Sequence, residues 1–158
     1  MSAQDILETA RAKGLMIATA ESCTGGMIAA ALTDLPGSSH VLDRGFVTYS
    51  NDAKMAMLGV RPATLEAQGA VSEAVAAEMA EGALYNSKAE LSVSVTGIAG
   101  PGGSEHKPEG RVCFAIAQIG QPTRTGTMEF GARGRDAVRQ ASTHHAIGLL
   151  RDALKASP

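Results

Sequence analysis

The chain has 158 residues, a length that fits one domain with a full hydrophobic core. Its 44% hydrophobic and 19% charged residues are typical of a folded globular protein rather than a disordered one. The formal net charge of -2 argues against nucleic-acid binding, which needs a basic excess. No stretch approaches the roughly 20 apolar residues of a membrane span, and no signal-peptide pattern opens the chain. We therefore expect a single cytoplasmic domain, residues 1–158, with neither a membrane nor a nucleic-acid partner.

Short apolar runs and helical patterns alternate along the first half of the chain. They predict, in chain order, a helix at 2–13, a strand at 15–20, a helix from residue 27, a strand at 45–49, and helices from residues 51 and 62. Ser2 is expected to cap the first helix and Gly14 to end it, because glycine readily adopts the left-handed conformation that closes a helix. Ser50 and Asn51 are the expected caps of the helix after the second strand.

The second half continues the alternation and then changes to a hairpin. It predicts a helix at 72–85 capped by Ser72, a strand at 91–96, a Gly- and Pro-rich loop at 97–110, strands at 111–119 and 123–130, and a helix at 134–156. On this last helix the spacing predicts a buried face formed by Val138, Ala141, His145 and Leu149. Together these elements predict an α/β fold, a three-layer α/β/α sandwich on a mixed sheet of about five strands.

Ser22 occupies the junction between a predicted buried strand and a glycine-rich helix start. Such a junction holds a side chain at the carboxyl edge of the sheet, where open α/β sheets bind ligands. Four backbone N–H groups there lack partners within the following helix and suit an oxyanion or a phosphate: those of Cys23, Thr24, Gly25 and Gly26. By position alone, Ser22 is either a nucleophile or a helix cap. Cys23 is a second candidate nucleophile, or else a buried apolar side chain.

A hydroxyl nucleophile needs a proton acceptor, and the four histidines lie in no recognisable catalytic or metal-binding motif. Lys54 is an alternative base, because it stands in the first turn of a predicted helix, where the helix dipole disfavours a cation. Tyr49, at the end of the preceding predicted strand, is placed to orient a group or relay a proton. The plainer alternatives are a solvated lysine and a half-buried tyrosine.

Two further segments suit the binding of an anion. The loop at 97–104 follows a strand and has four glycines in eight residues, as phosphate- or ring-binding loops often do, without matching a known nucleotide fingerprint. Arg133, Arg135 and Arg139 lie at the start of the last helix, where their charges repel one another unless an anion compensates. Arg135 and Arg139 are four residues apart and share a helix face. The alternative for all three is pairing with acidic side chains at the surface.

Five stretches of the chain resemble the CinA C-terminal-domain family, also known as the nicotinamide-nucleotide amidohydrolases. They are AESCTGG at 20–26, GFVTYSNDAK at 45–54, GAVSE at 69–73, SVTGIAGPGGSEHKPEGRV at 94–112, and GRDAVRQ at 134–140. The resemblance extends over nearly the whole chain in the family's order. It implies an α/β/α sandwich, commonly a homodimer. It also implies hydrolysis of the carboxamide of nicotinamide mononucleotide in pyridine-nucleotide recycling, with no metal and no cofactor.

The same resemblance implies roles for individual residues. Ser22 would be the nucleophile, Lys54 its base and Tyr49 their partner. The nucleotide site would be lined by Cys23, Thr24, Gly25, Gly26, Thr96, Gly97, Ile98, Ala99, Gly100, Arg135 and Arg139. The acidic residue that members often carry before the arginine is missing here, which leaves either Arg135 or Arg133 to hold the phosphate. Two alternatives are a non-catalytic nucleotide-binding module and an accessory protein of competence or DNA-damage repair.

Overall fold

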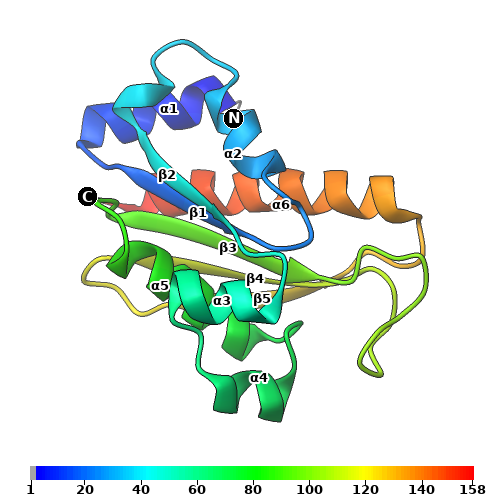
Figure 1. The fold of residues 1–158 in the computed structure, drawn as a ribbon. Helices are drawn as coiled ribbons and strands as arrows, with labels where there is room; N and C mark the ends of the chain where they lie inside the picture. The colour runs from blue at the N-terminus through cyan, green and yellow to red at the C-terminus, as the bar shows by residue number, and fades with distance from the viewer. Residues whose placement is uncertain (1–2) are drawn as a thin grey trace.

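The computed structural model describes residues 3–158, so the predicted cap Ser2 lies outside the described residues. Its centre is a five-stranded mixed sheet of order β2-β1-β3-β4-β5 (Figure 1). The strands are β1 (Ile17–Glu21), β2 (Leu42–Val47), β3 (Leu91–Gly97), β4 (Arg111–Gln118) and β5 (Arg124–Glu129). β1 runs parallel to both β2 and β3, whereas β4 is antiparallel to β3 and forms a hairpin with β5. The predicted mixed α/β sheet is confirmed.

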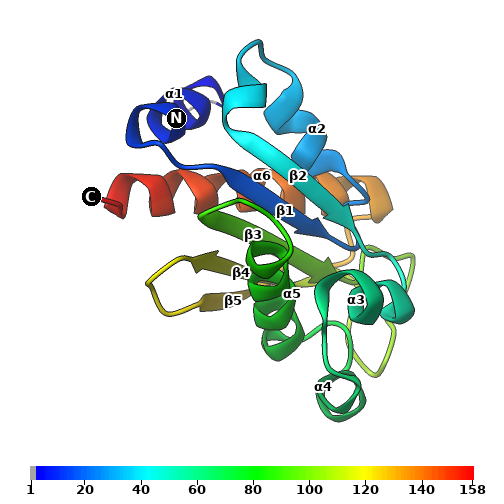
Figure 2. The ribbon, with the colours of Figure 1, turned by 60° about the vertical axis from the view of Figure 1, so that its left-hand side comes forward.

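Helices cover both faces of this sheet (Figures 1 and 2). One face carries α1 (Ala3–Lys13), α2 (Met27–Thr33) and α6 (Arg135–Ala156). The other carries α3 (Asn51–Leu58), α4 (Pro62–Gln68) and α5 (Glu73–Tyr85), and a short 3₁₀ turn, η1 (Ser38–His40), precedes β2. Because β1 and β3 are covered on both sides, β1 is buried along its whole length and β3 nearly so. No helix in the described range is long and apolar enough to cross a membrane.

Several of the predicted helix ends are present. Ser50 caps α3 by accepting a hydrogen bond from the Ala53 N–H at 3.0 Å, and Ser72 caps α5 by accepting one from Val75 at 3.2 Å. Gly14 follows α1 with φ of +68°, as expected for a residue that ends a helix. The second strand differs from its prediction: it spans Leu42–Val47, so Tyr49 lies beyond it in a loop.

The buried face predicted for the last helix is shifted by one residue, since Ala141, His145 and Leu149 are only partly buried. Val138 is buried as expected, but the buried face then continues through Ser142, Ala146 and Leu150. Ser142 tolerates burial because its hydroxyl donates to the Val138 carbonyl at 2.7 Å. Half-buried at the margin of this face, His145 packs against the Phe114 ring at 4.5 Å, and partial burial lowers its pKa. The buried face of α6 therefore combines small residues, such as Ser142 and Ala146, with the larger Val138 and Leu150.

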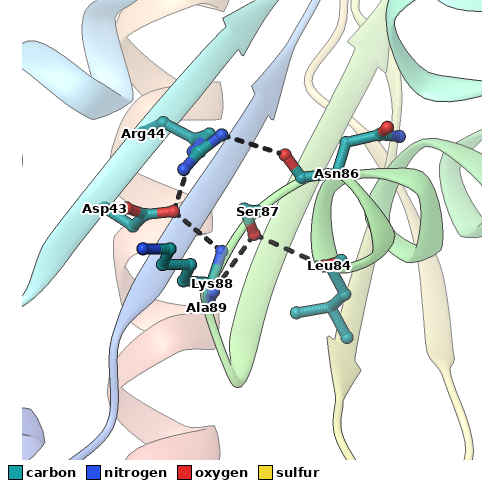
Figure 3. Close-up of polar contacts among 7 residues, drawn as sticks. All are labelled: Asp43, Arg44, Leu84, Asn86, Ser87, Lys88 and Ala89. Atoms are coloured by element: carbon teal, nitrogen blue, oxygen red, sulfur yellow. Dashed lines mark hydrogen bonds and ion pairs between the residues drawn. The ribbon is translucent and has the colours of Figure 1, made fainter.

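The end of the sheet that holds the amino ends of β1 and β3 is fixed by a network between β2 and the α5–β3 turn (Figure 3). The Asp43 carboxylate accepts the Lys88 N–H at 2.9 Å and pairs with Arg44 at 2.8 Å. Arg44 also donates to the Asn86 carbonyl at 3.3 Å. The hydrogen bond from the Lys88 backbone N–H and the nearby Arg44 guanidinium hold the pKa of Asp43 below its usual range. The network therefore ties β2 to the turn that leads into β3.

Candidate active site

A pocket of about 360 Å³ opens at the carboxyl ends of β1 and β3. Its walls are the turn after β1, the connection from β2 into α3, the loop after β3 and the start of α6. The chain leaves β1 on one face of the sheet to reach β2 and returns on the other face to reach β3 (Figure 2). Ligands bind at such topological switch points in open α/β sheets. All five residues at 96–100 that were predicted to line the nucleotide site line this pocket.

Ser22 and Lys54 meet inside the pocket, although they are 32 positions apart in the sequence. The Lys54 Nζ lies 2.9 Å from the Ser22 Oγ. The same amine donates to the Thr48 carbonyl, also at 2.9 Å. Lys54 is only 1% exposed and Ser22 is 8% exposed, so neither is a solvated surface side chain. The Thr48 carbonyl takes one N–H of the amine and thereby holds Nζ against the serine hydroxyl.

The environment of Lys54 favours the neutral amine. Burial lowers the pKa of Lys54, because its charged form loses hydration. The charges of Cys23 and Glu105 act in the opposite direction and raise it in part. No carboxylate forms an ion pair with Lys54 within the described residues. A neutral Nζ beside a serine hydroxyl is a suitable proton acceptor, as the position of Lys54 at the start of α3 suggested.

Cys23 is unsuited to nucleophilic attack. Its side chain is 5% exposed, and burial raises the pKa of the thiol to about 11. The Cys23 backbone N–H opposes this rise most strongly, and the charges of Lys54 and Arg139 oppose it less, without reversing it. Because the thiolate is the reactive form, this cysteine stays an unreactive thiol at neutral pH. Between the two candidate nucleophiles, the geometry favours Ser22.

Glu21 is a residue that sequence reasoning missed. It is fully buried at the end of β1, and its Oε1 accepts from the Thr24 hydroxyl at 2.6 Å, the Gly26 N–H at 3.2 Å and the Ile28 N–H at 2.9 Å. Its Oε2 accepts the Ala29 N–H at 3.0 Å. Glu21 therefore caps α2 and holds the turn that carries Ser22. The available signal was an acidic residue directly before a glycine-rich helix start.

This cap corrects the expectation that residues 23–26 offer a row of free donors. The Gly26 N–H is taken by Glu21, and the Gly25 N–H donates to the Ser22 carbonyl at 3.1 Å. A phosphate at this helix end would also face the Glu21 carboxylate. Within residues 3–158, the N–H groups of Cys23 and Thr24 donate to no other residue. Of the four predicted positions, only Cys23 lines the pocket.

The arginines at the start of α6 take separate positions. Arg135 lines the pocket, where its Nη1 donates to the Gly100 carbonyl at 2.7 Å and its Nη2 donates to the Tyr49 hydroxyl. Arg139 lies outside the pocket and donates to the carbonyls of Cys23 at 3.0 Å and Thr24 at 3.4 Å. Of the two arginines expected to line one site, only Arg135 lines this pocket, and a role of Arg139 in nucleotide binding stays a prediction. Arg133 does not line the pocket either.

Tyr49 lines the pocket but makes a different contact from the one expected. Its side chain is 60% exposed, and its hydroxyl accepts from Arg135. In the described part of the chain, no hydrogen bond joins it to Ser22 or Lys54. Tyr49 and Gly100 together orient the Arg135 guanidinium across the pocket mouth.

The loop after β3 is held in place from two sides. Lys107 donates to the carbonyls of Gln68 at 2.7 Å and Val71 at 2.6 Å. The Glu109 carboxylate accepts the Gly102 N–H at 2.7 Å and the N–H of Gly134, just before α6, at 3.1 Å. Gly100 has φ of +89°, and a Cβ there would lie 2.5 Å from the Glu109 carboxyl carbon, so only glycine fits. These contacts hold the loop in place as one wall of the pocket.

A buried serine–lysine pair in a small pocket at the switch point of an α/β/α sandwich places the chain among α/β proteins built for chemistry on a small molecule. The model of one family, the CinA C-terminal domain, matches residues 1–154. The chain therefore belongs to the CinA C-terminal-domain family.

Relatives and solved structures agree with this assignment. The chain is 49% identical over 148 residues to the nicotinamide-nucleotide amidohydrolase PncC of Escherichia coli K12, covering 93% of this chain and 89% of that protein. It is 49% identical to a CinA-like protein of Chloroherpeton thalassium, covering 98% of this chain and 37% of the relative. It spans a similar 34% of a competence-damage inducible protein of Symbiobacterium thermophilum, so it represents about a third of these longer proteins. The crystal structure of the competence/damage inducible protein CihA of Agrobacterium tumefaciens superposes with a TM-score of 0.92 at 51% identity, covering 97% of this chain and 93% of that one.

Proposed function

We propose that this protein hydrolyses the carboxamide of nicotinamide mononucleotide to nicotinate mononucleotide and ammonia, as part of pyridine-nucleotide recycling. The observation that carries the proposal is the 2.9 Å approach of a buried Lys54 Nζ to the Ser22 Oγ inside a pocket. The name of the Escherichia coli relative, a nicotinamide-nucleotide amidohydrolase, supplies the substrate. A positively charged pyridinium also withdraws electrons from its carboxamide, which favours nucleophilic attack on that carbon.

The acylation half of the reaction uses both members of the pair. The Ser22 Oγ attacks the carboxamide carbon while its proton passes to the neutral Lys54 Nζ. The N–H of Cys23, the residue after the nucleophile, is our candidate donor to the resulting oxyanion. The tetrahedral intermediate then collapses. The Lys54 ammonium gives its proton to the leaving nitrogen and the C–N bond breaks. Ammonia departs, and the acyl group remains as an ester on Ser22.

The hydrolytic half reuses the same base. The departure of ammonia leaves Lys54 neutral again, so it can accept a proton from water as the water oxygen attacks the ester carbon. Collapse of this second intermediate breaks the ester C–O bond, returns the proton from Lys54 to the Ser22 Oγ and releases a carboxylic acid, which loses its remaining proton to water at neutral pH. Arg135 is our candidate for the phosphate, because it lines the pocket and has further N–H donors beyond those bound to Gly100 and Tyr49.

Ammonia release from nicotinamide mononucleotide tests the proposal. Wild-type protein should release ammonia with a chelator present, and Ser22→Ala should release none while still binding the nucleotide. Release that does not need Ser22 would refute the serine mechanism. Binding without turnover in the wild type would instead indicate a non-catalytic binding module. The homodimer, the absence of a nucleic-acid partner and the single domain stay predictions, and light scattering addresses the first.

A further inference from the structure

A second charged side chain lines the same pocket and has no part in the proposed chemistry. Glu105 lies in the loop after β3 and lines the pocket, as does Arg135. Carboxylates and guanidiniums carry opposite charges at neutral pH. The pocket thus presents one positive and one negative group to whatever occupies it.

The backbone holds Glu105 in an uncommon conformation. Glu105 and His106 have φ of +51° and +62°, values that non-glycine residues rarely adopt. They form the tip of a tight turn closed by two hydrogen bonds between Ser104 and Lys107, at 3.0 and 2.7 Å. Left-handed residues of this kind persist only where the surroundings impose them, and they gather at binding sites.

The Glu105 carboxylate lies close to Gly69 and Lys107. Lys107 anchors the turn to the carbonyls of Gln68 and Val71, so its ammonium is already committed. The Glu105 Oε2 occupies the space beside Gly69, where any Cβ would collide with it. Within residues 3–158, Glu105 has no ion pair and its carboxylate accepts no hydrogen bond. An exposed carboxylate without a partner in a pocket wall attracts a cation.

The charge of Glu105 also reaches the reacting groups. It is one of the two charges that raise the pKa of Lys54 against the effect of burial. A ligand with its carboxamide carbon at the Ser22 Oγ therefore has its ring within the same electrostatic field.

From this arrangement we propose that Glu105 determines specificity for a permanently cationic ring, an N-alkylated pyridinium, while Arg135 takes the anionic end of the same molecule. This inference rests on the proposed function and adds to it a reason for selecting the oxidised mononucleotide. The reduced mononucleotide has the same ribose, phosphate and carboxamide, but its dihydropyridine ring is neutral. It therefore isolates the effect of the ring charge.

The test is calorimetric binding of the oxidised and the reduced mononucleotide to Ser22→Ala protein, in which turnover is blocked. Adding Glu105→Gln should raise the Kd for the oxidised nucleotide about three- to fivefold, as expected for a solvent-exposed charge pair. The Kd for the reduced nucleotide should stay unchanged. Adding Arg135→Ala should weaken both. Glu66→Gln, an exposed glutamate on α4, is the matched control and should change neither. In otherwise wild-type enzyme, Glu105→Gln should raise KM for the oxidised nucleotide with kcat on its alkaline plateau unchanged.

Two outcomes would overturn the inference. An equal loss of affinity for both nucleotides would indicate that Glu105 contacts the ribose hydroxyls. No loss of affinity for either would show that Glu105 does not contribute to binding. These failures are separable from failure of the proposed function. If the wild type releases no ammonia, but Glu105→Gln removes the preference for binding the oxidised nucleotide, the cation site is supported and the amidase activity is not. An active enzyme with no change in preference retains the amidase alone.

Discussion

The cap formed by Glu21 gives the sharpest prediction for stability. Replacing Glu21 with alanine removes an acceptor from four donors, of which the Thr24 hydroxyl and the Ile28 N–H are buried. A buried donor left without a partner costs about 1–3 kcal/mol, so two of them cost about 4 kcal/mol. For a domain of this size, each kcal/mol lowers Tm by roughly 2–4 °C. We therefore expect Glu21→Ala to lower Tm by about 10 °C or more.

Thermal unfolding followed by far-ultraviolet circular dichroism measures this loss. Glu21→Gln is the matched variant, because one amide oxygen in the place of Oε1 can still accept from Thr24, Gly26 and Ile28. It should lose less than alanine does, since only the Ala29 N–H, which would face the amide NH2 in the place of Oε2, is left without its acceptor. Glu66→Ala, at an exposed position on α4, should leave Tm nearly unchanged. A Tm for Glu21→Ala within about 2 °C of the wild type would refute the role of this carboxylate as the cap of α2.

Three further predictions concern the pocket. Lys54→Met should lower kcat by about 10²–10⁴-fold, and wild-type kcat should fall as acid protonates Lys54. Because folding lowers the pKa of Lys54, the unfolded chain binds more protons below the pKa of free lysine, and wild-type stability should rise relative to Lys54→Met as pH increases toward about 10. Cys23→Ala should keep near-wild-type kcat, and iodoacetamide should label Cys23 slowly at neutral pH. Arg135→Ala should raise KM about tenfold or more, whereas Arg139→Ala should mainly lower Tm.

Each of these has a contrary result. A kcat that stays flat into mildly acidic pH would exclude Lys54 as the base. Complete loss of activity in Cys23→Ala, with Tm unchanged, would move the nucleophile to the thiol. A larger rise in KM for Arg139→Ala than for Arg135→Ala would place the phosphate near the turn after β1 instead of at the pocket mouth.

The local elements could be predicted from the sequence because the signals behind them are local. Alternation of apolar and small polar residues marked β3, and the serines before α3 and α5 are caps because a hydroxyl reaches an N–H three residues later. The buried face of α6 was harder to predict. Ser142 is a polar residue, but its hydroxyl donates a hydrogen bond to a carbonyl of its own helix, so the side chain can face the core. Hydrophobicity alone does not reveal such local pairing.

The sequence by itself determined the α/β class, the family and the candidate residues Ser22 and Lys54, through motifs that lie within short stretches. Only the tertiary structure decided that these two side chains meet, because a crossover between parallel strands separates them. It also decided that Glu21 takes the donors expected to be free, and that Arg135 rather than Arg139 faces the pocket. A polar group is available to a ligand only if no other part of the chain has already bound it, and that depends on contacts between residues far apart in sequence.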